Sequence, residues 1–289
     1  MTTETGKTQM AKAVVTTQQS NAIAVGEAIP DWMTGKAGLG TEALSGSAFS
    51  PPRLKMSQAL SPELETMAGL KAGNFFNSMS EMVYGEKVEI IPCFLTESYL
   101  LFAPRIPGST GGLLARADDG VHWNVPQGQF EVTLDKKGNK AVWKMAPTVA
   151  QSGLANWGTF DPSDKNSPPA ATHSINLVCL VASDLNSGPM VFSFVRSALK
   201  NGKKFASNLK MSRVPAFGRL FELSAAKVNG PAGDYYEPRT KAIGFVQDQS
   251  VYKLAESVYE MSAERGVQVN LGDDEAGPQG APTNENANY

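Results

Sequence analysis

Short apolar runs separated by Gly-, Pro- and Asn-containing turns fill most of the chain. The runs at 88–95 and 98–103 predict two β-strands, and Pro92 inside the first run predicts an edge strand or a bulge. Residues 130–134 alternate apolar and polar side chains and are followed, after a turn with Lys and Gly, by a similar run at 141–145. These two runs predict a β-hairpin.

Further strands and two helices are predicted in the second half of the chain. The segment at 174–182 is apolar on both faces in its second part, which is typical of a strand inside a sheet. The other predicted strands lie at 189–194, 219–228 and 242–247, and the helices at 194–211 and 249–265. In the last helix the apolar side chains that recur at helical spacing, and should pack on the sheet, are Val251, Leu254, Ala255, Val258 and Met261.

Many short strands with few helices indicate a mainly β (α+β) fold. We expect an OB-like Greek-key barrel or sandwich that carries one basic helix and a C-terminal helix. The chain should have a mostly disordered leader at 1–50, a single strand-rich nucleic-acid-binding domain at 51–265 and an acidic flexible tail at 266–289, because both ends lack apolar periodicity.

The cysteine and histidine content argues against many kinds of enzyme. Cys93 and Cys179 each lie in an apolar run, which favours buried, reduced thiols over a disulfide or a nucleophile. With two histidines and no C-x2-C pair, zinc sites built from Cys and His are not expected. No apolar run reaches the about 20 residues of a membrane span, and no signal peptide is recognisable. We expect a cytoplasmic protein with no cofactor and no metal.

The net charge of -2 conceals a strongly basic segment. The tail at 266–289 holds four acids and no base, while residues 53–265 hold three more bases than acids. Residues 185–221 contain seven bases and no acid, namely Arg196, Lys200, Lys203, Lys204, Lys210, Arg213 and Arg219. Such a segment is typical of a surface that binds a polyanion.

On a helix, most of these basic side chains fall on one side, and apolar side chains such as Leu199, Phe205 and Leu209 fall on the other. The basic side predicts contacts with phosphates, and the alternative is an ordinary solvated helix face. Gly202 in the middle of the segment would equally fit a basic loop.

Aromatic side chains occur in Gly-, Asn- and Pro-containing contexts at 122–124, 156–160 and 234–237. Exposed rings in such contexts can stack on unpaired bases. The side chains that we assign to this role are Trp157, Phe160, Tyr235 and Tyr236. The alternative for each ring is packing in the core or anchoring of a loop.

Sequence motifs of nucleotide-binding loops, hydrolases and metalloproteases are absent. The Gly-rich stretch at 108–112 predicts a flexible loop, with phosphate contact through backbone N–H groups as the alternative. Two close pairs of acids are candidates for magnesium binding, Asp118 with Asp119 and Asp161 with Asp164. The alternative is that they cap local turns.

The stretches 52–63 with 71–78, and 214–223 with 233–236, resemble a widespread group of tailed-phage proteins from replication and recombination gene blocks. In its predicted plan, a strand-rich body with a basic groove and an acidic tail, the chain is also similar to phage single-stranded DNA-binding proteins with an OB-fold. The resemblance covers 52–262. It implies a protein of the host cytoplasm that binds single-stranded DNA, with replication or recombination proteins as partners of the tail and a homo-oligomer as an allowed state.

We therefore expect a non-enzymatic protein that binds and protects single-stranded DNA, without sequence preference, during phage replication or recombination. The seven bases would contact phosphates, and the four aromatic side chains would stack on bases. One alternative is a phage structural or assembly protein that makes subunit contacts. The other is a magnesium-dependent nuclease that uses Asp118 and Asp119.

Overall fold

The computed structural model describes residues 51–106, 111–125, 127–230 and 233–265. The predicted leader and acidic tail, and most of the Gly-rich stretch at 108–112, lie outside the described residues. No helix within the described ranges is long and apolar enough to cross a membrane.

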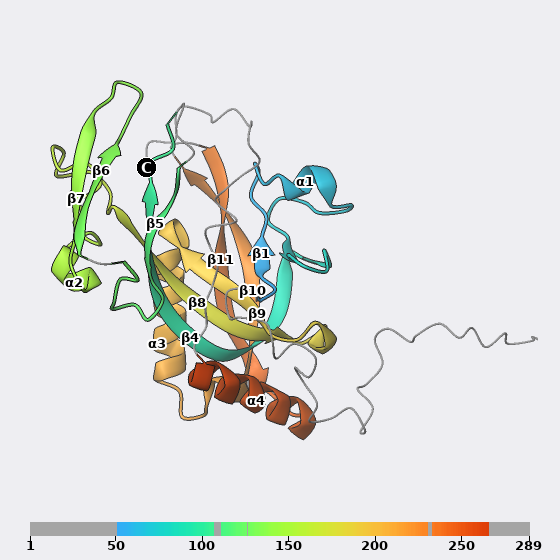
Figure 1. Ribbon diagram of the computed structural model, residues 1–289. Coiled ribbons are helices and arrows are strands. Elements are labelled where there is room, and N and C mark those ends of the chain that lie inside the picture. The colour runs from blue at the N-terminus through green and yellow to red at the C-terminus, as the bar shows by residue number, and fades with distance from the viewer. Residues whose placement is uncertain (1–50, 107–110, 126, 231–232, 266–289) are drawn as a thin grey trace, which may run out of the picture. The chain divides into compact units, whose positions relative to one another are not determined.

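A six-stranded antiparallel sheet is the main element of the described residues (Figure 1). Its strands run in the order β11-β10-β4-β8-β9, and β5 pairs with the end of β4. Their bounds are β4 Lys87–Ala103, β5 Gly112–Ala117, β8 Ala171–Val181, β9 Met190–Val195, β10 Arg219–Gly230 and β11 Gly233–Phe245. The mainly β (α+β) class is confirmed, and so is the interior position of the segment at 174–182, because β8 pairs with both β4 and β9.

β4 is one continuous strand of 17 residues, so the prediction of two strands at 88–95 and 98–103 is wrong. Backbone pairing with β8 continues through the polar residues 96–98, and this pairing holds the strand together where the sequence suggests a break. The register shifts between Pro92 and Phe94, which confirms the predicted bulge. A bulge allows proline, which cannot donate a hydrogen bond to its neighbour, to lie inside a sheet.

Helices cover opposite faces of this sheet. Alternate residues of β8 point to different sides, so Leu177 packs in a cluster with Phe205 of α3, while Val178 packs in another with Val258 of α4. A small three-stranded sheet shares the α3 side, since Leu54 and Phe75 belong to the same cluster. The bounds of these elements are β1 Leu54–Met56, β2 Phe75–Asn77, β3 Val83–Gly85, α3 Leu199–Lys210 and α4 Gln249–Arg265.

The predicted hairpin is confirmed, and it builds a separate apolar cluster with β5 and a short helix (Figure 1). Trp143 on the hairpin is 1% exposed and lies opposite Phe130. The elements of this part are β6 Gly128–Thr133, β7 Lys140–Met145 and α2 Val149–Ser152. The remaining short helices are α1 Glu63–Thr66, η3 Leu185–Ser187, η4 Arg196–Ala198 and η5 Ala216–Gly218.

α4 has the bounds that the sequence predicts, but only part of its apolar stripe faces the sheet. Ala255 and Val258 are buried, and Ser262 continues the same line. Leu254 and Met261 are 39% and 42% exposed, so the prediction that they pack on the sheet is wrong. The contact line follows one narrow helix face, and at about 100° per residue these two side chains lie roughly 70–90° from its centre.

α3 begins later than the predicted helix at 194–211, because Phe194 still belongs to β9. The 3-10 turn η4 joins the two elements, and Arg196 there has a positive φ of 50°. Gly202 lies within the continuous helix, so the alternative of a basic loop is wrong. A Cβ atom at Gly202 would lie 2.6 Å from Cβ of Phe194, which means that the helix backbone rests directly on β9.

Replacing Gly202 with alanine should lower the free energy of unfolding. Alanine gains about 1 kcal/mol of helix propensity over glycine. The new methyl group overlaps Phe194, which is 0% exposed and cannot move aside, and overpacking of this kind costs about 1–3 kcal/mol. We expect a net loss of up to about 2 kcal/mol in urea unfolding. As a control, Gly128→Ala adds its methyl group where nothing lies within 4 Å, and an equal loss in both variants would contradict the close-packing argument.

Candidate nucleic-acid interface

α3 separates its apolar and basic side chains onto two faces. Phe205 is 1% exposed, and its ring lies between those of Phe194 and Phe221, with centroids 6.1 and 5.0 Å away. The exposed side chains include Lys200, Lys203, Lys204 and Lys210. Because Phe205 faces the core, helix geometry directs these lysines to solvent. Within the described part of the chain, none of the four forms an ion pair with a carboxylate.

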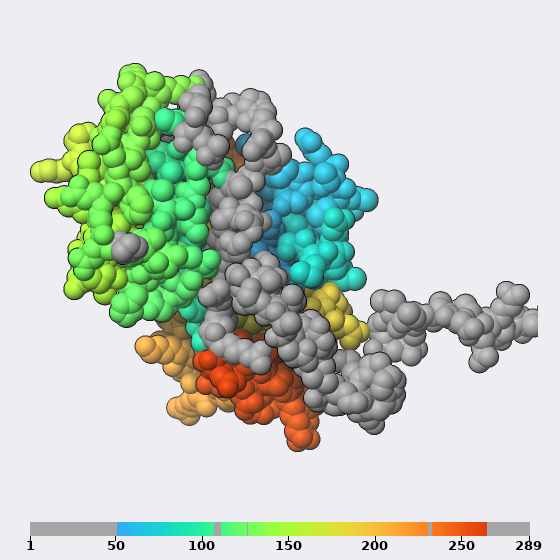
Figure 2. Space-filling model, in the orientation of Figure 1, coloured from blue at the N-terminus to red at the C-terminus, as the bar shows by residue number. Residues whose placement is uncertain are grey.

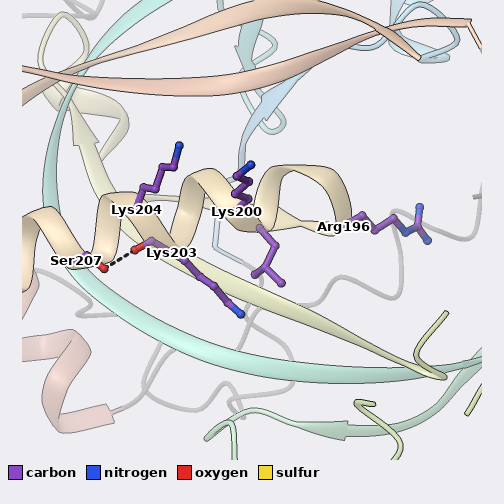
Figure 3. A pocket seen from close by; sticks show the side chains of 6 residues that line it. Arg196, Lys200, Lys203, Lys204 and Ser207 are labelled. Atoms are coloured by element: carbon purple, nitrogen blue, oxygen red, sulfur yellow. Dashed lines mark hydrogen bonds between the residues drawn. The ribbon is translucent and has the colours of Figure 1, made fainter. Parts of the chain in front are cut away.

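Three of these lysines surround a shallow hollow of about 670 Å³ on the outer side of α3. It is lined by Arg196, Leu199, Lys200, Lys203, Lys204 and Ser207 (Figure 3). Figure 3 shows Lys200 and Lys204 pointing to one side of the helix, Lys203 to the other, and Arg196 beyond its beginning. No carboxylate lines the hollow, so Lys200, Lys203 and Lys204 share it without a carboxylate beside them.

On the side of β10 and β11, two asparagines of α3 form hydrogen bonds with arginines of these strands. Asn208 Oδ1 accepts a hydrogen bond of 2.8 Å from Arg219 Nη1, and the Arg219 guanidinium lies 4.7 Å from the centre of the Phe221 ring. Asn201 Oδ1 accepts a bond of 3.1 Å from Arg239 Nη1. Arg219 and Arg239 therefore extend the cationic groups of the hollow, and we name all six residues the basic surface. Its members are Arg196, Lys200, Lys203, Lys204, Arg219 and Arg239.

Arg239 is the member that the sequence did not reveal. It lies on β11, outside the acid-free segment, and Glu237 two residues earlier balances its charge in any count along the chain. The two other predicted phosphate contacts, Lys210 and Arg213, are exposed at the end of α3 and in the loop that follows. No described contact links these two side chains to the hollow.

On the side of β8, Lys203 lies near a histidine that the sequence did not single out. The His173 ring stacks on Tyr99, with centroids 4.4 Å apart and an angle of 9° between the rings, and His173 Nε2 lies 3.5 Å from Glu97 Oε2. Burial lowers the pKa of His173; Glu97 opposes this change, whereas the charge of Lys203 adds to it. The charged form of His173 is therefore disfavoured on this side of α3.

The predicted aromatic contacts fall into two places. Trp157 is 70% exposed in the loop after α2, whereas Phe160 in the same loop packs on Trp143, with centroids 5.9 Å apart. The loop is held in shape, because Gly158 N–H donates to the Ser167 carbonyl at 2.7 Å and Trp143 Nε1 donates to the Phe160 carbonyl at 3.1 Å. The Trp157 side chain is thus accessible from solvent, whereas the Phe160 side chain packs against Trp143.

Tyr235 and Tyr236 are consecutive residues of β11, so their side chains point to opposite faces of the strand. The Tyr235 hydroxyl donates to Glu237 at 3.3 Å, and Glu237 in turn contacts Asn201 of α3. Tyr236 is held by Gln58, whose side chain bonds both its N–H and its carbonyl. The structure therefore brings Tyr235 toward the basic surface. In the third aromatic context, Trp123 is only 7% exposed, so the expectation of an exposed ring there is wrong.

The predicted magnesium ligands hold local structure. Asp118 bonds the Arg116 guanidinium at 2.6 and 2.8 Å. Partial desolvation would raise the pKa of Asp119, but hydrogen bonds from the His122 backbone and ring and from the Val121 backbone lower it to about 2. Asp161 and Asp164 each accept a backbone N–H two residues further on. Within the described residues, no three His, Cys, Asp or Glu side chains are grouped to hold a metal.

Comparisons with known proteins gave one match. Neither the curated proteins nor the solved structures include one that matches this chain. The model of the family described as Pam3 phage gp34-like protein matches residues 13–268, a range that includes all the described elements. The chain therefore belongs to the Pam3 phage gp34-like protein family.

Proposed function

We propose that this protein binds single-stranded DNA without sequence preference and protects it during phage replication or recombination. The observation that supports this most is the hollow on α3, where Lys200, Lys203 and Lys204 gather beside Arg196 and no carboxylate lines the hollow. Like charges held together on one surface repel one another, and a polyanion relieves that repulsion and releases its own counterions. Membership of a phage family agrees with the proposed setting.

Aromatic side chains favour unpaired over paired DNA in this proposal. Trp157 is 70% exposed on a hydrogen-bonded loop, so little conformational freedom is lost when a base stacks on it. Tyr235 lies near the basic surface through Glu237. Phe160 and Tyr236 are committed to packing and to Gln58, so we assign them no direct contact with bases.

A second candidate is the structural or assembly role. It is supported by exposed apolar side chains, since Met211 is 84% exposed and Phe245 56% exposed, and such side chains are common in subunit contacts. This role requires no polyanion and makes the basic surface incidental. For the acidic tail, which lies outside the described residues, we propose replication or recombination proteins as partners.

Binding should weaken steeply as salt is added. If the four cations of the hollow each neutralise one phosphate of a single strand, raising the salt concentration sixfold should lower the binding constant about 100-fold. Fluorescence anisotropy of a labelled oligonucleotide, titrated with the full chain from 50 to 300 mM salt, measures this slope. Binding that does not change with salt, or no binding at the lowest salt, would contradict the proposed function.

Reversing two charges of the hollow should reduce binding far more than reversing two charges elsewhere. We expect Lys203→Glu with Lys204→Glu to weaken binding of single-stranded DNA at least about tenfold at 50 mM salt. The matched control is Lys137→Glu with Lys144→Glu, which makes the same change in net charge on exposed positions of the β6–β7 hairpin. The assembly role predicts instead that neither double variant alters the function, and that stable oligomers form without nucleic acid.

Trp157 should report and strengthen the binding of unpaired bases. Trp157→Ala should cost about 1–3 kcal/mol in binding of single strands and leave duplex binding nearly unchanged. Trp123 and Trp143 are 7% and 1% exposed, and Trp32 lies outside the described residues, so in a Trp32→Phe background the quenching of tryptophan fluorescence by DNA should largely disappear with this variant. Leu60→Ala removes another exposed apolar side chain, 85% exposed, and serves as the control. Equal losses for single and double strands in Trp157→Ala would argue against stacking.

A further inference from the structure

Three hydrogen-bond donors converge on the carboxylate of Glu237 where β11 meets α3. Asn201 Nδ2 lies 3.2 Å and Arg239 Nη2 3.0 Å from Glu237 Oε2. The Tyr235 hydroxyl lies 3.3 Å from Oε1 of the same side chain. An amide, a guanidinium and a phenol, which come from two different elements, therefore hold one anionic group.

A further hydrogen bond between two of the donors also holds them in place. Arg239 Nη1 also donates to Asn201 Oδ1 at 3.1 Å, so the two side chains hold each other. Asn201 is only 6% exposed within α3, whereas the Arg239 side chain is 50% exposed. The cluster thus has one buried wall and one open wall, and a ligand can reach it from solvent.

The chemistry of these donors suits a phosphate as well as a carboxylate. A guanidinium can donate two parallel bonds to a phosphate, and amide and hydroxyl donors supply the remaining contacts that its oxygens need. Lys200 precedes Asn201 in α3 and lies on the hollow of the basic surface, so a DNA backbone on that surface passes near the cluster.

We propose that Asn201, Tyr235 and Arg239 form an anion-binding site for a DNA phosphate, and that Glu237 is its resident anion, which the phosphate displaces. This inference rests on the proposed binding of single-stranded DNA. Glu237 lies on β11, the edge strand of the sheet, so its side chain can turn out into water once a phosphate replaces it. The Glu237 side chain is 14% exposed, so it already reaches water, and a phosphate that replaces it keeps all three donors paired, which limits the cost of the exchange.

The displacement has two consequences at the basic surface. Arg239 gives its charge to the DNA only after Glu237 leaves, so the free protein carries one cationic contact in reserve. The Tyr235 hydroxyl then donates to the phosphate instead of to Glu237, which holds its ring beside the strand, where a base can stack on it. Contact with a phosphate and stacking by Tyr235 are therefore coupled through Glu237.

A double-mutant cycle between Glu237 and Arg239 tests this exchange. Glu237→Gln keeps the size of the side chain but removes the competing charge, and it should tighten binding of a labelled single-stranded oligonucleotide about 3- to 10-fold at 50 mM salt. Arg239→Gln alone should weaken binding less than about twofold, whereas in the Glu237→Gln background the same change should weaken it about tenfold. The reason is that a DNA phosphate can bind Arg239 without competition only when residue 237 no longer carries a carboxylate.

A matched variant separates this exchange from a general change in charge. Glu222→Gln makes the same change on β10, where the carboxylate pairs with Lys87 at 3.3 Å, and it should tighten binding less than Glu237→Gln does. Equal effects of the two glutamate variants, or an equal loss from Arg239→Gln in both backgrounds, would show that Glu237 only holds the structure. Absence of salt-dependent binding by the unaltered chain would instead overturn the proposed function, and this inference with it.

Discussion

The seating of α3 on the sheet through Phe205 is the contact on which the rest of the described structure depends. The Phe205 ring touches Phe194 on β9 and Phe221 on β10, two strands that are separated in the sheet by β8 and β4. Phe192 and Phe75 extend the same row of rings to the small sheet. Burial of these rings, rather than backbone pairing, joins the two ends of the sheet. Figure 2 shows the surface around this core, with the side chains of α4 in red below those of the β6–β7 hairpin region in green.

The position of the cationic groups follows from this apolar contact. Because Phe205 and Gly202 face β9, the 3.6-residue period of the helix directs the lysines of α3 to solvent. The residues at the border between the two faces, Asn201 and Asn208, then meet β11 and β10 and bring two arginines to the same surface. The basic surface is thus a consequence of core packing as much as of the basic composition of its segment.

The proposed function combines this surface with two aromatic side chains. These two side chains differ in how they are connected to α3. Tyr235 is tied to α3 through Glu237, so a phosphate and a base can be contacted together there. Trp157 lies in the loop that contributes Phe160 to the hairpin cluster, and no contact within the described residues connects it to α3.

Local patterns in the sequence determined much of this protein: the hairpin at 130–145, the extent of α4, the bulge at Pro92 and the basic side of α3. Each depends on periods, turns or charges within about 20 residues of one another, which the sequence displays directly. Tertiary structure alone decided the rest. Residues 96–98 form part of β4 because β8 pairs with them, Phe160 is a packing side chain because Trp143 lies beside it, and Arg239 joins the basic surface because Asn201, 38 positions earlier, is brought within hydrogen-bond distance. These outcomes depend on contacts between distant segments, which exist only after the apolar side chains of the sheet and of α3 have been buried together.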